Sequence, residues 1–265
     1  MHKVSAAQAA YLNSLKRHRQ KVMFFRLLIF IAFILLWEGA ARTGLVNDFI
    51  FSSPARMFQT FLSMTKDGSI FYHTGITLAE TLVSVLCVLA ATLVLAMVLW
   101  WNQTLYEILE PYLVVLNSLP KSAMAPVLIV WLGNNPKTII VTGILISVFG
   151  SVMSLTVNFR EADPEQIKLI YTLKGGKMDV LRKVLIPRSL PAFISLMKVN
   201  VGLCLVGVII GEFLAANAGL GYLIIYGSQV FKMDWVMMSI VILCILAAGL
   251  YALINAVERW CARRW

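Results

Sequence analysis

Apolar runs of roughly membrane-spanning length divide this sequence and constrain its fold more than any other feature. We expect them to form helices over residues 22–41, 75–101, 111–132, 137–159, 192–216 and 234–257. Each run is close to the ~20 residues that an α-helix needs to cross a bilayer. Hydrophobic residues make up 60% of the chain and charged residues only 14%, whereas soluble domains carry about 25% charge. The sequence therefore predicts an all-α integral membrane protein with about six transmembrane helices.

The placement of positive charge predicts the orientation of these helices. The net charge is +10, and Lys and Arg cluster beside the apolar runs. If both termini are cytosolic, most of this charge lies inside, and the outer segments hold only Arg42, Arg56, Lys66, Lys137 and Lys232. This bias follows the positive-inside rule. We therefore expect a multi-pass protein of the cytoplasmic (inner) membrane in contact with lipid, with residues 1–21 and 258–265 as cytosolic basic tails and no nucleic-acid partner.

Residues that could support catalysis are sparse in the apolar runs. The four cysteines and three histidines are scattered and show no metal-ligand spacing. The charged residues Glu80, Lys121 and Glu212 lie inside predicted spans without an evident His or Asp partner. A phosphate-binding loop is also missing, because Met178 follows Gly176-Lys177 where Ser or Thr is needed. An integral-membrane enzyme is thus the weaker interpretation, and we expect no catalytic, metal or cofactor site on this chain.

Residues 22–69 combine the first span with a mixed segment. Ser53-Pro54 is typical of a helix start, with Ser as the cap and Pro in the first turn. The short helix that follows has an apolar stripe, which either lies along the outer membrane interface or packs on the bundle: Met57, Phe58, Phe61, Leu62 and Met64.

Residues 163–191 form the longest polar, basic interruption in the chain. Asp163-Pro164 predicts a helix start, and this first helix is expected to end near residue 173 at the Gly175-Gly176 break. A second helix is expected over about 178–186, with Pro187 and Pro191 bracketing the start of the fifth span. Its apolar face would consist of Met178, Leu181, Val184 and Leu185. Because connections this long are uncommon unless functional, we predict a cytosolic two-helix knob that docks into a groove on a partner.

The same loop carries a resemblance to a known family. The run Leu173-Lys174-Gly175-Gly176-Lys177, continued by Val180–Pro187 and Leu190-Pro191, resembles the EAA loop of ABC importer permeases. More closely, the chain resembles permeases of the nitrate/sulfonate/taurine group. The stretches that support this are Leu119–Pro126, Val130–Gly133, Gly211–Leu214 and Ala218–Tyr222. The resemblance covers about residues 70–257.

The chain departs from the family pattern at three places. Lys168-Leu169-Ile170 stands where the family has Glu-Ala-Ala. Lys174 takes the position of the family's central glycine, with glycine displaced to 175 and 176. Glu80 stands where a basic residue is usual. These departures concern the docking contacts and the substrate subgroup rather than the fold.

The resemblance implies an assembly of several chains. Residues 70–257 would form the permease domain, and a second permease copy would complete a homodimer. Two cytosolic ATPase subunits, with ATP and Mg bound to them, would hold the loops, and an extracytoplasmic solute-binding protein would deliver substrate. The residues expected at the ATPase contact are Gln166, Leu169, Leu173, Lys174, Gly175, Gly176, Lys177, Met178 and Leu181.

Lys121 is the main candidate for a substrate contact. It lies about ten residues into the third predicted span, between Pro120 and Pro126, which free backbone carbonyls that could line a path. It would meet an anionic solute there, or it would simply snorkel to the inner surface. Glu212 is either a gate or subunit contact, or a carboxylate at the wet outer interface.

The full expected pathway set is Asn117, Pro120, Lys121, Ser122, Pro126, Asn200 and Glu212, and Gly219 and Gly221 are expected to permit a tight turn at an outer gate. We therefore predict the permease subunit of an ATP-driven importer of a small solute, and Lys121 favours an anionic one. The alternative is a membrane channel or scaffold subunit that is not coupled to ATP hydrolysis.

Overall fold

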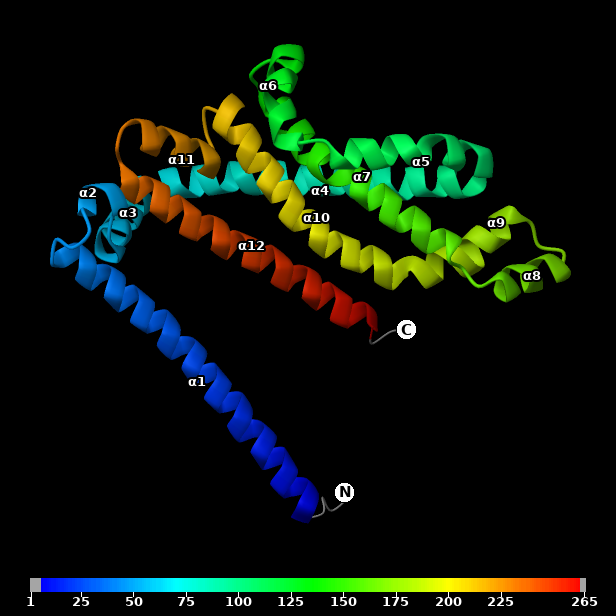
Figure 1. The fold of residues 1–265 in the computed structure, drawn as a ribbon, viewed down its shortest axis with the longest axis horizontal. Coiled ribbons are helices and arrows are strands. Elements are labelled where there is room, and N and C mark those ends of the chain that lie inside the picture. The colour runs from blue at the N-terminus through cyan, green and yellow to red at the C-terminus, as the bar shows by residue number, and fades with distance from the viewer. Residues whose placement is uncertain (1–5, 263–265) are drawn as a thin grey trace.

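The computed structural model describes residues 6–262, which are helical with no strand in that range (Figure 1). The helices are α1 (Ala6–Arg42), α2 (Asp48–Phe51), α3 (Pro54–Lys66), α4 (Ser69–Trp101), α5 (Gln103–Ser118), α6 (Lys121–Leu132), α7 (Pro136–Arg160), α8 (Pro164–Thr172), α9 (Lys177–Val180), a π-helical segment (Leu181–Leu185), α10 (Ile186–Ala215), α11 (Leu220–Gln229) and α12 (Met233–Ala262). Five helical segments are long and apolar enough to cross a membrane, and the bent pair α5–α6 is a sixth candidate. The predicted all-α membrane fold is confirmed.

The centre of the bundle is formed by α4, α7 and α10, which cross with their backbones nearly in contact. A methyl group added to Gly207 on α10 would lie 2.6 Å from the Cα of Gly143 on α7. One added to Gly211 would lie 2.9 Å from the Cα of Ile139, and one added to Gly143 would lie 2.8 Å from Ser84 Oγ on α4. Gly207 and Gly211 are four residues apart, the spacing that lets membrane helices pack closely. Small residues at the crossing thus allow the helix backbones to approach closely.

Polar side chains follow this crossing along the length of the bundle. Ser84 Oγ donates to the Ile140 carbonyl oxygen across 3.2 Å, and Ser151 Oγ donates to Asn200 Oδ1 across 2.6 Å. In a membrane interior such bonds satisfy groups that have no water partner. Asn200, expected in the substrate pathway, is instead fully buried between α7 and α10.

The third predicted span, residues 111–132, is not a single helix. The chain bends by 95° between α5 and α6. Leu119 is extended (φ −61°, ψ 144°) because the ring of Pro120 disfavours helical geometry in the residue before it. Pro111 lies inside α5, which begins at Gln103 with Asn102 as its cap.

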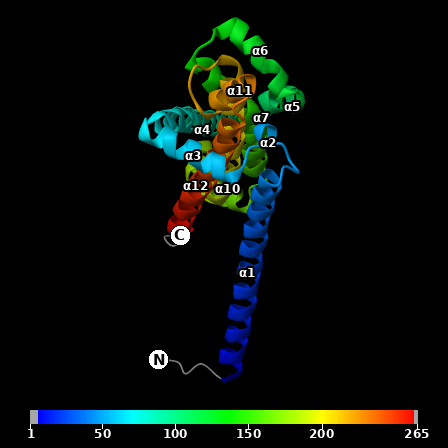
Figure 2. The same cartoon turned by 90° about the vertical axis from the view of Figure 1, so that its left-hand side faces the viewer.

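The first span is longer than predicted. No Gly or Pro interrupts residues 6–38, and α1 continues from Ala6 through the region expected to be a separate tail. Figure 2 shows α1 standing away from the rest of the bundle. It is tied at its end, where Glu38 Oε2 accepts from the Ala55 backbone N–H across 3.0 Å. Residues 1–5 and 263–265 of the two predicted basic tails lie outside the described residues.

The amphipathic segment forms α3 as predicted. The Ser53 hydroxyl accepts from the Arg56 N–H across 3.3 Å, and Pro54 is in the first turn. Met64 is buried in a cluster with Leu223 and Met238, whereas Phe58 is largely exposed. One edge of the stripe therefore packs on the bundle and the other faces outward.

The helix crossing predicts a sharp contrast between two glycines of α10. Gly207→Ala should lower the free energy of unfolding by about 2 kcal/mol, since overpacking a close contact costs 1–3 kcal/mol. Gly202→Ala is the matched control, because no atom lies within 4 Å of the added methyl group. Thermal unfolding of both variants in detergent measures the difference. Equal stability of the two would contradict the crossing.

Candidate functional site: the coupling loop and the outer cap

The coupling loop, residues 163–180, begins as the sequence predicts. Asp163 Oδ1 accepts from the Glu165 N–H across 2.9 Å and caps α8. At the other end of α8, the Lys174 N–H donates to the Tyr171 carbonyl and the Gly175 N–H donates to the Ile170 carbonyl. These two bonds form a Schellman motif, which closes a helix by placing one residue in the left-handed region.

The left-handed residue is Lys174 (φ 62°), not either of the glycines that were expected to make the reversal. Glycine would fit this position without strain, and the family pattern has glycine there. Gly175 is needed for a different reason: a methyl group at this position would lie 2.6 Å from the Cγ2 of Ile170. The loop thus keeps a compact turn with its glycine one residue late.

The second helix of the loop was predicted to end before the fifth span, but it does not. Helix α9, the π-helical segment and α10 run on as one helical segment, Lys177–Ala215. The π-helical turn ends two residues before Pro187, whose missing N–H and ring disturb the normal hydrogen-bond ladder. Leu181, expected at the ATPase contact, is only 7% exposed and packs against α4 and α7 residues including Ala96 and Phe159.

The remaining docking residues are accessible. Leu169, Leu173 and Met178 are each about half exposed or more, and Tyr171, which the sequence analysis missed, is exposed beside them. Most of the polar docking residues are also on the surface: Gln166, Lys174, Gly176 and Lys177. The loop therefore presents an apolar patch ringed by positive charge, at the end of the bundle opposite α2, α3 and α11 (Figure 1).

At that opposite end, Glu212 of α10 caps helix α11. It is fully buried within the chain rather than exposed on its surface. Glu212 Oε1 accepts from the Thr77 hydroxyl across 2.7 Å, and Oε2 accepts from the Gly221 N–H across 2.5 Å. A carboxylate suits the positive N-terminal end of a helix. This side chain joins α10, α4 and α11.

The predicted gate glycines enclose this carboxylate. A methyl group on Gly219 would lie 2.3 Å from Glu212 Oε1, and one on Gly221 would lie 2.7 Å from Oε2. Gly219 also has φ +117°, a conformation that other residues rarely adopt. Its N–H donates to His73 Nδ1 across 3.0 Å. The glycines therefore permit close approach to Glu212.

Glu80 adds a second carboxyl group to this site. It is 7% exposed and lies within hydrogen-bond reach of Glu212. Two carboxyl groups buried this close together repel each other when both are charged. Sequence spacing could not predict that Glu80 and Glu212 lie together, since they belong to different spans.

Comparison with known proteins identifies the chain. Residues 89–265 match the family model of the binding-protein-dependent transport system inner membrane component. The chain belongs to this family. It is 28% identical over 225 residues to a probable ABC transporter permease protein of Haemophilus influenzae, covering 85% of this chain and 91% of that one. It is 22% identical to a putative aliphatic sulfonates transport permease protein of Bacillus subtilis, over 88% of this chain and 84% of that one.

The fold agrees with solved structures of such permeases. A chain of the MetNI methionine ABC transporter in an inward-facing conformation superposes with a TM-score of 0.61. The match covers 71% of this permease and 93% of the MetNI chain at 19% identity. The predicted resemblance to ABC importer permeases of the sulfonate and taurine type is confirmed.

The permease brings together only part of the expected substrate pathway. Lys121 Nζ donates to Asn117 Oδ1 across 3.1 Å and to the Ile146 carbonyl oxygen across 2.8 Å, so it clamps the α5–α6 bend onto α7. Asn200 is buried elsewhere, in the helix crossing. Glu212 is buried where it caps α11 beside Thr77, Gly219 and Gly221, the arrangement that we call the outer cap. Pro120, Ser122 and Pro126 lie exposed along the bend and α6.

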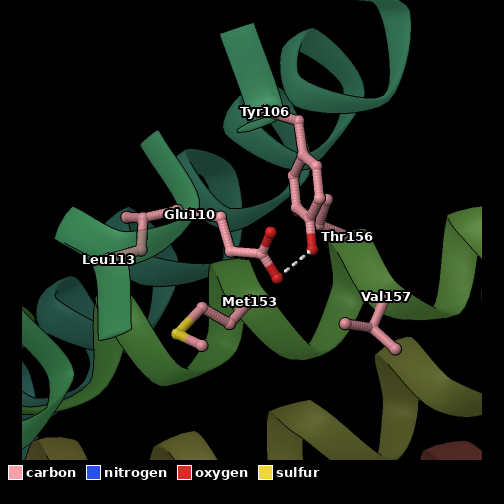
Figure 3. A pocket seen from close by; sticks show the side chains of 6 residues that line it. All are labelled: Tyr106, Glu110, Leu113, Met153, Thr156 and Val157. Carbon is pink, nitrogen blue, oxygen red and sulfur yellow. Dashed lines mark hydrogen bonds between the residues drawn. The ribbon is translucent and has the colours of Figure 1, made fainter. Parts of the chain in front are cut away.

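A small cavity of about 40 Å³ lies beside α5 on the α7 side (Figure 3). Figure 3 shows Tyr106, whose hydroxyl donates to Glu110 Oε1 across 2.8 Å, above Met153 and Thr156 of α7. The sequence analysis missed Tyr106 and Glu110, because they precede the predicted third span and belong to no recognisable motif.

The outer cap predicts the effect of removing Glu212. Glu212→Ala leaves the buried Gly221 N–H without an acceptor and the Thr77 hydroxyl with only its longer bond to the His73 carbonyl, so the free energy of unfolding should fall by about 2 kcal/mol. Glu212→Gln keeps an acceptor oxygen and should lose less. Thermal unfolding in detergent compares the two, and an alanine variant within about 0.5 kcal/mol of wild type would rule out the cap.

The left-handed Lys174 predicts that glycine improves the loop. Lys174→Gly should protect the α8 amides from hydrogen exchange several-fold better than Lys174→Ala, since a left-handed residue with a Cβ costs roughly 1 kcal/mol. Alanine is the matched control because both changes remove the charge. Protection that is the same in both variants would mean that the turn stores no strain.

Proposed function

We propose that this permease is the membrane subunit of an ATP-driven importer, and that the coupling loop is the contact for a cytosolic ATPase. The observation that carries the proposal is the exposed apolar residues of α8 and α9, since α9 begins the continuous helical segment Lys177–Ala215 that contains Glu212. A rigid element with a docking surface at one end and a gate at the other is what coupling requires.

The remaining partners follow from the family. Two ATPase subunits would bind ATP and Mg, a second permease copy would complete the pathway, and a binding protein would deliver the solute outside. Both termini would lie in the cytosol, in agreement with the charge bias. The solute is proposed to be a small anion, because Lys121 lies at the broken span and a relative is a sulfonate permease.

Cysteine crosslinking tests the docking surface. Leu173→Cys, co-expressed with a candidate partner ATPase, should capture it through an engineered cysteine on the ATPase. Phe231→Cys, which is equally exposed but lies between α11 and α12, is the matched control and should capture nothing. Failure of every exposed loop position to capture an ATPase would favour the channel or scaffold alternative.

Lys121 is tested by uptake. Lys121→Met should lower uptake at limiting solute about tenfold, the loss expected for one charge-assisted hydrogen bond, while ATPase co-purification is unchanged. Lys137→Met removes an exposed charge at the start of α7 and should transport normally. Normal uptake by the Lys121 variant would remove this residue from the pathway.

A further inference from the structure

Arg160, the last residue of α7, is held in place by two side chains of α5. Its guanidinium carbon lies 4.0 Å from the centre of the Tyr106 ring, and one Nη donates to Gln103 Oε1. Tyr106 is fixed in turn by its hydrogen bond to Glu110. Stacking on a ring and an amide contact orient the planar guanidinium before any ligand arrives.

Arg160 makes no direct ion pair within the described part of the chain, although the two side chains that hold it are bonded to carboxylates, Gln103 to Glu107 and Tyr106 to Glu110. A guanidinium has five N–H donors, and Gln103 accounts for one of them. No Asp or Glu among residues 15–259 lies within ion-pair distance of Arg160, whereas Lys183 and Lys198 each have a carboxylate partner. The N–H donors of Arg160 that Gln103 does not use are therefore available to an anion.

Arg160 borders a shallow surface cavity of about 200 Å³, open to solvent, that is also lined by Trp100 and Gln103. A water molecule occupies about 30 Å³ of liquid, so this volume holds a group of phosphate size with its hydration. Trp100 and Trp101 end α4, as tryptophans do at a membrane interface. Lys177 of the coupling loop adds a second cation, with its Nζ 5.9 Å from the centre of the Trp101 ring.

We propose that Arg160, with Gln103 and Trp100, forms a binding site for a phosphate or sulfonate group beside the coupling loop. Arginine binds tetrahedral oxyanions through paired N–H···O bonds, and the unused donors of Arg160 supply them. The group comes either from the headgroup of an anionic phospholipid or from a free anion in solution. Because Lys177 belongs to the coupling loop and lies over Trp101, next to Trp100 of this site, an occupied site would restrain the loop.

The test uses the full-length permease alone, so that its outcome is independent of ATPase coupling. The protein is reconstituted in nanodiscs of phosphatidylcholine, with or without phosphatidylglycerol, and its unfolding temperature is measured by intrinsic fluorescence. Inorganic phosphate and methanesulfonate are titrated into the phosphatidylcholine discs at constant ionic strength. The variants are Arg160→Gln and its control Arg182→Gln, an exposed arginine at the same end of the bundle but outside the cavity. Gln103→Glu places a carboxylate beside Arg160 and serves if Arg160→Gln does not fold.

Stabilisation of wild type by phosphatidylglycerol but not by the free anions identifies a lipid headgroup, and saturable stabilisation by the free anions identifies a soluble ligand. In either case Arg160→Gln or Gln103→Glu should weaken binding at least about tenfold, and Arg182→Gln should not, because each charge-assisted bond contributes about that factor. Equal responses of wild type and Arg160→Gln, or equal losses in the Arg160 and Arg182 variants, would overturn the site.

Discussion

The close crossing of α7 and α10 is the contact on which the rest of the permease depends. Gly143 and Gly207 let the two backbones meet, and Ser84 of α4 closes the third side. In lipid there is no hydrophobic drive to bring apolar helices together, so close packing and interhelical hydrogen bonds must do it. A single added methyl group at this point separates the helices that position both ends of the molecule.

This crossing holds a continuous but curved helical rod, Lys177–Ala215, whose two ends have different chemistry (Figure 1). The segment Lys177–Ala215 starts in the polar loop and reaches almost to the Gly219–Gly221 cradle around Glu212. Its one irregular stretch is the π-helical turn Leu181–Leu185, yet Leu181, Val184 and Leu185 are buried against neighbouring helices. Packing therefore restrains the rod at the place where its hydrogen bonding is weakest.

Sequence patterns predicted most of the helices and the coupling loop, because hydropathy and capping residues are local signals. Asp163 and Ser53 cap the helices that they were expected to cap. The break at Leu119-Pro120 also has a local signal, since a residue before proline disfavours helical geometry. The continuous apolar run around it nevertheless led to the prediction of a single span.

What the sequence could not supply depended on contacts between distant residues. Burial of Glu212 is tolerated because the Thr77 hydroxyl and the Gly221 N–H donate hydrogen bonds to its carboxylate. Thr77 is far from Glu212 in the sequence, so no local pattern indicates this contact. Leu181 looked like part of a docking face because the loop helix was expected to stop; since the helix continues into α10, the same face packs inward. The position of Arg160 over the Tyr106 ring depends on α5 packing beside α7, which no local sequence pattern indicates.

The distance between the two ends of the rod tests the account most directly. Spin labels at Met178→Cys and Leu214→Cys, both exposed positions, can be placed in a background without native cysteines and measured by double electron–electron resonance in the assembled transporter. Because the segment curves between them, the labels should be closer together than the roughly 50 Å that a straight α-helix of this length would span (Figure 1). We predict that ATP binding leaves this distance unchanged within about 2 Å, since the rod moves as one body. A change larger than one helical turn, about 5 Å, would show that the helix bends and that motion of the loop does not reach the outer cap.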